Sequence, residues 1–477
     1  MRETELKNNG KNPDLKGQYG TAIVLGAGKS GVAAVRFLLA KGLTVALYDE
    51  NPAAKPVYGE LRALGCEIIL GEVPDVSPYR LAVISPGMPL TAPIAVALKA
   101  AHIPVWGELE LASRFIEAPI IGITGTNGKT TTTTLVGEIF KNAGYRTFVG
   151  GNIGIPLLES LKEEYDYYVV EMSSFQLETV ETMNATVSLY LNLTPDHLNR
   201  HGDMNGYLDA KAKMAEKQTS DHYTVLNVDD EYMSSLSSRA GGKIFGFSRR
   251  QKVYFGSYVY GNSVIFQGHA EDRNIRVMDK REIRIPGPHN LENALAAITA
   301  AKIMGIEEEI IAETLKTFGG VEHRLEDVMT YRGVRYVNDS KGTNPDAVFK
   351  ALASYGDAPI VLIAGGRNKG NNFDELGKLI KKKCKYLVLI GEAAAEMKAS
   401  AEKAEFYHIA VAEDMAAAVA KAAAEAEKGD VVLLSPANAS FDMFDSFEHR
   451  GKVFKDIVLK LRKGKTYDLT KAEAKST

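Results

Sequence analysis

The chain has 477 residues, of which 45% are hydrophobic and 25% are charged, and its formal net charge is −3. A chain of this length is expected to form several domains, and its balanced charge gives no reason to expect a nucleic acid as partner. Two cysteines are too few for a disulfide framework or a thiolate metal site. The polar N-terminus lacks a signal-peptide core and the apolar runs are too short for a bilayer, so a cytoplasmic protein without membrane contact is expected.

Residues 1–107 alternate β-rich runs with helix-like stretches, which is typical of a parallel sheet covered by helices. In "VLGAGKSGVAAV" the dinucleotide fingerprint G-x-G-x-x-G is matched by Gly26, Gly28 and Gly31. Asp49 ends the next strand, where an acidic residue would bind a ribose hydroxyl. A turn without ligand, a nicotinamide dinucleotide and another diphosphate-linked ligand all fit this pattern.

Residues 108–321 open with a shortened phosphate loop, "ITGTNGKTTTTTLV". The full P-loop pattern has four residues between its first glycine and the Gly-Lys pair, but Gly125 stands only three before Gly128. The loop keeps Lys129 as a point charge and the hydroxyl of Thr130 for magnesium, between a strand and a helix. We expect it to bind a nucleoside triphosphate; a solvated lysine in a tight turn is the alternative.

Two later strand ends in this block carry candidate ligands. Glu171 ends "YYVVE" and resembles a Walker-B acid, with a salt bridge as the alternative. His197 follows another strand and fits a metal ligand or a hydrogen-bonded core residue, whereas His201 is expected in a loop. Between residues 252 and 285 alternating patterns predict a small antiparallel sheet, and two helices follow.

Residues 322–465 predict a third α/β domain, and residues 466–477 a polar tail. "NDSKGTNPDAV" and "SPANASFDMFDSFEHRG" place polar clusters directly after two strands, where open α/β sheets bind ligands. Helix caps and turns would explain either cluster alone. Both together favour a second substrate.

The order of these motifs resembles the Mur ligases, the ATP-dependent amino-acid-adding enzymes of bacterial cell-wall synthesis. The resemblance rests on "GTNGKTT", "GGNIG", "EMSSFQL", "TPDHLNRH", "HNLENALAA", "EHRLE" and "NDSKGTNPDA". Four further stretches, "SPGMPL", "GELELA", "GGRNKG" and "SPANASFDMF", are most similar to the D-glutamate-adding members. The resemblance implies three α/β domains, with Rossmann-like sheets at both ends and a P-loop domain between them. It also implies a monomeric ligase that uses ATP and Mg²⁺ to join UDP-N-acetylmuramoyl-L-alanine and D-glutamate through an acyl phosphate.

The resemblance implies a role for each matching residue. It assigns the UDP-linked substrate to Gly28, Lys29, Ser30, Asp49, Ser85, Gly87 and Asn152. It assigns ATP to Gly125, Thr126, Asn127, Gly128, Lys129, Thr130, Thr131, Asn290, Asn293, Arg324 and Asp339. It assigns D-glutamate to Lys341, Thr343, Lys369, Ser440, Phe441 and Phe447. It makes Lys129, Glu171, His197 and Lys211 catalytic, and it assigns magnesium to Thr130, Glu171, His197 and Lys211 as a carbamate.

Lys211 receives this role from the resemblance alone. Without it, Lys211 is expected to be a solvated helix lysine, and Lys213 is the substitute if the register slips. Asn199 and Asn368 stand where the family frequently has an acid, which leaves the proposed metal ligands intact.

Four other functions fit parts of the sequence. A sibling ligase or a folylpolyglutamate-type synthetase shares the central pattern, but the latter gives no reason for the first glycine loop. An NAD-dependent dehydrogenase explains "GAGKSG" and leaves "GTNGKT" without a role. A regulatory nucleotide-binding module needs no third domain with a ligand site.

Overall fold

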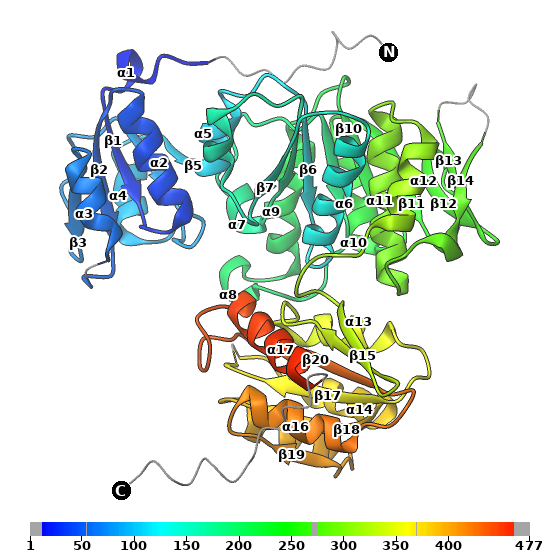
Figure 1. Ribbon diagram of the computed structural model, residues 1–477. Coiled ribbons are helices and arrows are strands. Elements are labelled where there is room, and N and C mark those ends of the chain that lie inside the picture. The colour runs from blue at the N-terminus through cyan, green and yellow to red at the C-terminus, as the bar shows by residue number, and fades with distance from the viewer. Residues whose placement is uncertain (1–11, 54, 269–273, 369, 462–477) are drawn as a thin grey trace, which may run out of the picture. The chain divides into compact units, whose positions relative to one another are not determined.

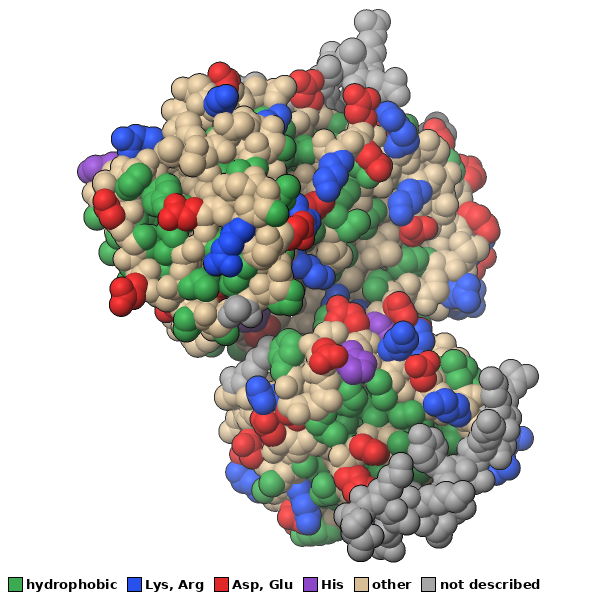
Figure 2. All heavy atoms as spheres, turned by 60° about the vertical axis from the view of Figure 1, so that its left-hand side comes forward, with side chains coloured by type: hydrophobic (Ala, Val, Ile, Leu, Met, Phe, Trp, Pro, Cys, Tyr) green, Lys and Arg blue, Asp and Glu red, His purple; other side chains and the backbone are tan. Residues whose placement is uncertain are grey.

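The computed structural model describes residues 12–53, 55–268, 274–368 and 370–461. The chain divides into two compact units, one of Met1–Arg284 with Asn290–Phe318 and one of Ile285–His289 with Gly319–Thr477. Within the described ranges, no helix combines the length and the apolar character needed to cross a bilayer. Figure 2 shows lysine and arginine side chains interspersed with aspartate and glutamate on the visible face of each unit.

The first unit begins with a parallel sheet in the order β3-β2-β1-β4-β5 (Figure 1). Its strands are β1 Thr21–Leu25, β2 Thr44–Asp49, β3 Glu67–Leu70, β4 Leu81–Ile84 and β5 Val105–Gly107. Its helices are α1 Leu15–Gln18, α2 Lys29–Ala40, α3 Val57–Ala63 and α4 Pro93–Ala100. The last four residues of β1 are fully buried, as expected for a parallel sheet with both faces covered.

The second sheet of this unit has nine strands in the order β14-β13-β12-β11-β10-β9-β6-β8-β7. They are β6 Ile120–Thr124, β7 Thr147–Gly151, β8 Tyr167–Glu171, β9 Val187–Tyr190, β10 Tyr223–Asn227, β11 Lys243–Ser248, β12 Gly256–Tyr260, β13 Ser263–Gln267 and β14 Ile275–Asp279. The α-helices are α5 Glu108–Ser113, α6 Lys129–Asn142, α7 Ser174–Leu177, α8 Leu198–His201, α9 Met204–Glu216, α10 Glu231–Ser235, α11 Pro288–Ile303 and α12 Glu308–Thr317. Three 3₁₀ turns are η1 Leu157–Lys162, η2 Leu236–Ser238 and η3 Lys280–Glu282.

The antiparallel pairing predicted for residues 252–285 is confirmed in β12, β13 and β14. These strands do not stand apart as a sheet, because β12 pairs in parallel with β11 and so continues the central sheet. The alternation of the sequence identifies strands, but it carries no information about which neighbour their outer strand will join.

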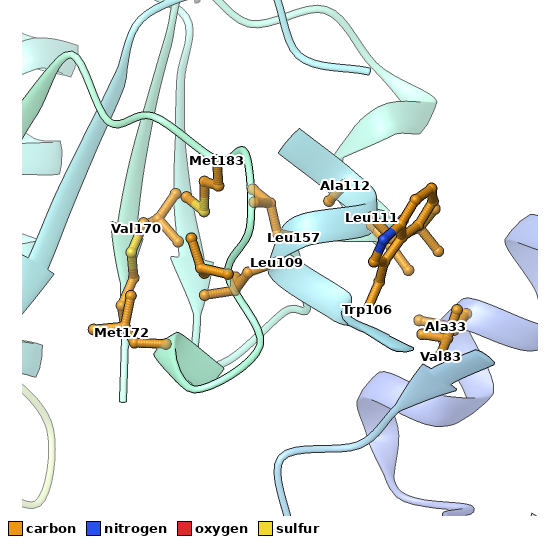
Figure 3. Close-up of a cluster of buried hydrophobic side chains, with 14 of the residues drawn as sticks. Ala33, Val83, Trp106, Leu109, Leu111, Ala112, Leu157, Val170, Met172 and Met183 are labelled. Carbon is orange, nitrogen blue, oxygen red and sulfur yellow. The ribbon is translucent and has the colours of Figure 1, made fainter. Parts of the chain in front are cut away.

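One continuous hydrophobic core joins the two sheets of the first unit through the short helix α5 (Figure 3). Leu109 points toward Leu157 and Met183 of the central domain, whereas Trp106 lies on the side of Ala33 and Val83. Since one buried cluster contains all of these residues, the sheet that carries the first glycine loop and the sheet that carries the phosphate loop share one hydrophobic core.

The second unit contains a six-stranded sheet in the order β15-β16-β20-β17-β18-β19. Its strands are β15 Glu326–Tyr331, β16 Val334–Asn338, β17 Ile360–Gly365, β18 Cys384–Ile390, β19 Ile409–Val411 and β20 Val431–Ala437. Its helices are α13 Pro345–Ala353, α14 Asp374–Lys383, α15 Ala394–Lys403, α16 Met415–Glu425 and α17 Phe447–Leu461. Alternate residues of β17 enter two different hydrophobic cores. Leu362 packs in the core that contains residues of α13 and α14, and Val361 packs in the core that contains residues of α16 and α17. Both faces are therefore covered, and the α/β class predicted for all three sheets is confirmed.

Strand β15 was not predicted. It forms an antiparallel hairpin with β16, joined by Arg332 and Gly333, both with positive φ (52° and 79°). A two-residue turn of this kind is a hairpin signal, so the stretch "YRGV" could have predicted the hairpin.

Candidate active site

The phosphate loop connects β6 to α6 and is almost entirely buried. Gly125 has φ 156° and Gly128 has φ 85°, conformations that favour glycine. A Cβ on Gly128 would lie 2.4 Å from Oδ1 of Asn293, so α11 packs directly against the loop. Asn293 also donates to Oδ1 of Asn290 at 3.2 Å, which places both predicted adenine-side asparagines together on α11.

Asn192, which follows β9, holds the phosphate loop through hydrogen bonds to its backbone. Its carbonyl accepts from the amide of Thr126 at 2.9 Å, and its Oδ1 accepts from the amide of Asn127 at 2.9 Å. Its Nδ2 donates to the carbonyl of Asn127 at 3.0 Å. Sequence reasoning missed this residue, although a polar side chain directly after a strand of an α/β sheet is a signal for it.

Lys129, the first residue of α6, folds back over the loop. Its Nζ donates to the carbonyls of Gly125 and Thr126, each at 2.8 Å. The ammonium group is thus held among the loop carbonyls at a helix N-terminus, a place that favours anionic phosphate oxygens.

Thr130 and Glu171 meet where β6 and β8 end side by side. Strand pairing sets Ile123 opposite Glu171, and Oγ1 of Thr130 donates to Oε2 of Glu171 at 2.8 Å. The second carboxylate oxygen accepts from Nδ2 of Asn152 at 2.8 Å. A hydroxyl beside a carboxylate is a set of hard oxygen donors that fits Mg²⁺. Asn152, assigned to the UDP-substrate by resemblance, therefore contacts the candidate metal ligand.

Lys211 on α9 lies against the same loop and is only 1% exposed. Its Nζ donates to the carbonyl of Gly125 at 3.0 Å and to Oγ1 of Thr124 at 3.3 Å, and lies 4.6 Å from the ring centre of Tyr207. Burial, and then the nearby charge of Lys129, hold the pKa of Lys211 well below its ordinary 10.5. The expectation of a solvated lysine is wrong, because burial of one helix face depends on tertiary packing.

Lys213, two residues further along α9, points elsewhere. Its Nζ donates to the carbonyl of Glu178 at 2.5 Å. The structure thus places Lys211, and not its substitute Lys213, at the phosphate loop.

His197 precedes the short helix α8, and His201 is the last residue of that helix. His197 has φ 55°, and its side chain is 44% exposed, with a ring centre 4.7 Å from that of Phe175. The side chain of His201 is only 4% exposed, stacks on Tyr207 and makes a 2.9 Å hydrogen bond with Ser174. Burial lowers the pKa of His201. His201 is therefore a packed helix residue, and the prediction of a loop residue is wrong.

Among the described residues, two groups of three acidic or histidine side chains are close enough to hold a metal ion, with their ligand atoms within 4.8 Å of one another. Neither group includes Glu171 or His197. One is Glu322, His323 and Glu326, where Lys455 already forms ion pairs with both glutamates. The other is the run Glu307, Glu308 and Glu309 at the start of α12, where Glu308 is half-buried and pairs with Lys302.

The first glycine loop is arranged around a carboxylate. Oδ2 of Asp49 accepts from the amide of Ala27 at 3.2 Å, from Nζ of Lys55 at 2.5 Å and from the hydroxyl of Tyr58 at 3.0 Å. Burial alone would raise the pKa of Asp49, but these hydrogen bonds outweigh it and lower the pKa. Ser85 donates to the carbonyl of Gly26 at 3.0 Å. The remaining predicted residues of this site lie at the same strand ends, Gly28, Lys29 and Gly87 exposed and Ser30 half-buried.

In the second unit, most of the predicted residues lie on loops that follow β16 and β20, whereas Arg324 precedes β15 and Phe447 begins α17. Asp339 is buried, and its Oδ2 accepts from Ser435 at 2.6 Å. Burial raises the pKa of Asp339 to about 6, despite this hydrogen bond and the charge of Arg324. Nζ of Lys341 lies 5.4 Å from the ring centre of Phe447.

The other residues assigned to D-glutamate differ in exposure. Thr343 is half-buried, Ser440 is buried and Phe441 is 62% exposed. Lys369 lies outside the described residues.

Comparison with known proteins agrees with this architecture. Residues 20–107 match the model of a Mur ligase MurD-like N-terminal domain, residues 123–301 a Mur ligase middle domain and residues 323–438 a Mur ligase glutamate ligase domain. The chain is 51% identical over 455 residues to a UDP-N-acetylmuramoylalanine–D-glutamate ligase of Pelotomaculum thermopropionicum, covering 93% of this chain and 98% of the relative. The chain belongs to the Mur ligase family.

Other family members are similar over comparable lengths. A UDP-N-acetylmuramoylalanine–D-glutamate ligase of Thermoanaerobacter is 45% identical over 460 residues, covering 94% of this chain and all of the relative. A pseudomurein peptide ligase type C of Methanothermus fervidus shares the fold, with a TM-score of 0.58 at 20% identity, over 93% of this chain and 100% of that chain. The family resemblance inferred from the motifs is therefore confirmed, whereas the role of each site residue and the domain limits stay predictions.

Proposed function

We propose that the chain is an ATP-dependent ligase that joins the carboxylate of UDP-N-acetylmuramoyl-L-alanine to the amine of D-glutamate in peptidoglycan precursor synthesis. Its relatives with this name match along almost the whole chain, including both end domains. The observation that carries the chemistry is the phosphate loop, where Lys129, the Thr130–Glu171 pair and Lys211 converge.

Amide formation from a carboxylate needs a better leaving group than oxide. Transfer of the γ-phosphoryl group of ATP to the alanyl carboxylate gives an acyl phosphate, which the amine of D-glutamate attacks with release of phosphate. Both steps pass through anionic transition states, so positioning and electrostatic stabilisation dominate. Lys129, held at the loop by two carbonyls, is proposed to turn toward the transferring phosphoryl oxygens.

Mg²⁺, when bound, supplies positive charge that offsets the charge of the phosphate oxygens. We propose that Thr130, Glu171, His197 and Lys211 hold it. A lysine with a depressed pKa has a neutral amine available to combine with CO₂, and the resulting carbamate would present anionic oxygens in place of a cation.

The UDP-linked substrate and D-glutamate are proposed to bind to the N-terminal and the C-terminal domain, respectively. The first glycine loop, with Asp49, Ser85 and Asn152, takes the UDP-linked substrate. The loops after β16 and β20 take D-glutamate. The domain limits 107, 321 and 465, the monomeric state and the cytoplasmic location stay predictions from the sequence.

Phosphate release measured with ATP, the UDP-linked acceptor and a panel of amino acids tests this function. We expect release with D-glutamate and not with L-glutamate, L-alanine, L-lysine or diaminopimelate. Release with a different amino acid would indicate a sibling ligase, release with a folate acceptor would indicate a folylpolyglutamate-type synthetase, and nicotinamide reduction without release would overturn the ligase.

A further inference from the structure

Arg450, in the first turns of α17, is a buried arginine that the mechanism above does not use. It is 1% exposed, and burying a guanidinium group costs free energy unless its N–H groups are hydrogen-bonded. Within the described residues its five hydrogen bonds all end on neutral oxygens of Ser340, Asn438 and Ala439.

The first of these bonds tie the loop after β16 to α17. Nε of Arg450 donates to Oγ of Ser340 at 3.0 Å, and Nη2 donates to the carbonyl of the same residue at 2.8 Å. The hydroxyl of Ser340 in turn donates to the carbonyl of Phe447 at 2.8 Å. One side chain thus joins a loop that carries Lys341 to the helix that begins with Phe447.

The other bonds hold the loop after β20. Nη1 and Nη2 each donate to the carbonyl of Asn438 at 3.2 Å, and Nη1 also donates to the carbonyl of Ala439 at 3.3 Å. Fixing these carbonyls fixes the peptide planes, and therefore the amides of Ala439 and Ser440. Ser440 is a residue assigned to D-glutamate.

A third loop, after β17, is hydrogen-bonded to the backbone of Ala439. The backbones of Ala439 and Arg367 exchange two hydrogen bonds, of 2.9 and 3.2 Å. Gly366 beside them has φ 120°, and a Cβ there would lie 2.2 Å from the carbonyl of Ala439 and 3.1 Å from Nη1 of Arg450. The close approach of the three loops requires glycine at this position.

The guanidinium also brings a charge to this end of the sheet. Burial lowers the pKa of Arg450 to about 10, which leaves it protonated at neutral pH, and Asp442 and Asp339 are the acidic groups that act on it. Since its own hydrogen bonds go to neutral oxygens, its charge adds to the field that an anionic amino acid meets.

We propose that Arg450 is a positioning residue for D-glutamate, because one guanidinium group holds together the loops after β16 and β20, which form the proposed D-glutamate site. The proposal rests on the function proposed above. It places the effect of Arg450 on the affinity for the amino acid, and not on the phosphate loop.

The experiment compares steady-state kinetics of the full chain with Arg450→Ala and Arg450→Lys. Arg450→Ala leaves buried carbonyls without their donor and frees the two loops, so we expect KM for D-glutamate to rise roughly tenfold to hundredfold. KM for ATP and for the UDP-linked acceptor should stay within about twofold, because the hydrogen bonds of Arg450 end on Ser340, Asn438 and Ala439, none of which is assigned to either substrate. Arg450→Lys keeps the charge without the planar fork and should not restore KM.

Added guanidinium ion, at concentrations far below denaturing ones, supplies the second readout. It should lower KM for D-glutamate in Arg450→Ala, while sodium and methylammonium should not. Arg335→Ala is the matched control, because Arg335 lies on β16 of the same sheet, has a side chain 44% exposed and pairs with Asp327. This control should keep the wild-type KM and show no response to guanidinium.

An unchanged KM for D-glutamate in Arg450→Ala, or an equal loss for all three substrates without rescue, would overturn the proposal. If Arg450→Ala does not fold, Ser340→Ala decides, since it removes one acceptor of the guanidinium and must raise KM for D-glutamate selectively. A failure of the proposed function itself is seen separately, as a wild-type chain that releases no phosphate with D-glutamate. The kinetics are then run with the amino acid that supports release.

Discussion

The two glycine loops of the first unit have the same plan and differ in what surrounds them. Each joins a buried parallel strand to a helix whose first residue is a lysine, Lys29 on α2 and Lys129 on α6. In the first loop Gly28 and Lys29 are exposed, and the fixed charge is the carboxylate of Asp49 below the loop. In the second loop Gly125 and Gly128 are buried, and the fixed charge is the ammonium group of Lys129 at the loop itself.

This difference shows that completeness of a glycine motif says little about which loop carries the reaction. The first loop matches its fingerprint fully but offers backbone amides on an open surface, which suits the grip on a diphosphate handle. The second lacks one residue of the full P-loop pattern, yet it concentrates a cation, a hydroxyl and a carboxylate in a place where electrostatic interactions are strong.

The largest expected effect comes from replacing Lys129, the first residue of α6. Lys129→Met should lower kcat/KM for ligation a few hundred-fold, since a single well-placed donor to transition-state charge is typically worth ~3–4 kcal/mol. Binding of the UDP-linked acceptor, measured by calorimetry, should not change.

Lys29→Met is the matched variant at the same helix position of the first loop. It should leave kcat unchanged and raise only KM for the UDP-linked acceptor, by about twofold to fivefold, as for an exposed charge. Equal effects of the two substitutions on kcat would remove the distinction between the loops.

Glu171→Gln tests whether the charge beside Thr130 serves the metal. The side chain keeps its shape and can still accept from Thr130, so folding should be preserved. Loss of the anionic ligand should raise the Mg²⁺ concentration for half-maximal ligation about tenfold to hundredfold, in the range of changes near metal sites. A normal magnesium titration would exclude Glu171 as a ligand.

Asp49→Asn is the corresponding change in the first loop, and its effect should be smaller. The asparagine loses the charged acceptor that Lys55 and Tyr58 share, and hydrogen bonds to charged groups are worth about 1.5–3 kcal/mol. We expect KM for the UDP-linked acceptor to rise about tenfold with the magnesium titration unchanged. A shifted magnesium titration in Asp49→Asn would mean that the two loops are coupled through their common core.

Much of this arrangement could be predicted, because strand ends of a parallel sheet meet at one edge. The positions of Gly125, Thr130 and Glu171 followed from strand patterns and motif spacing alone. Environment could not be predicted in the same way. Lys211 looks like a solvated helix lysine and His201 like a loop residue, yet Tyr207 packs against both, and only the tertiary fold buries them.

The position of Asn192 after a strand is a general signal for a functional residue, but the hydrogen bonds that Asn192 and Arg450 make to backbone groups were beyond the sequence. Each acts by binding backbone groups of loops distant in sequence, and such bonds leave no periodicity or spacing to detect. The hairpin of β15 differs, because its turn residues are a local signal that strand pattern alone overlooks.

The smallest expected effect concerns the two buried ionisable groups at the loops, Asp49 and Lys211, whose lowered pKa values make stability rise with pH in two different pH ranges. The pKa of Asp49 is lowered in the folded chain, so its contribution stabilises the fold above its unfolded pKa and is lost as pH falls. The pKa of Lys211 is also lowered, so here too the unfolded chain binds the proton more tightly, but at higher pH and with the protonated form being the charged one. Between the lowered pKa and 10.5 the unfolded state therefore holds more protons, and stability rises with pH.

Chemical unfolding in CO₂-free buffer without ATP or Mg²⁺ measures this slope. From neutral pH toward pH 10, the free energy of unfolding of the wild type relative to Lys211→Met should rise by up to about 1.4 kcal/mol per pH unit. Bicarbonate should reduce the slope in the wild type and not in Lys211→Met, because a carbamate removes the amine that titrates. Parallel curves for the two proteins would mean that Lys211 keeps its proton in the folded chain, and the second loop would then contain two permanent cations in place of one cation and one convertible amine.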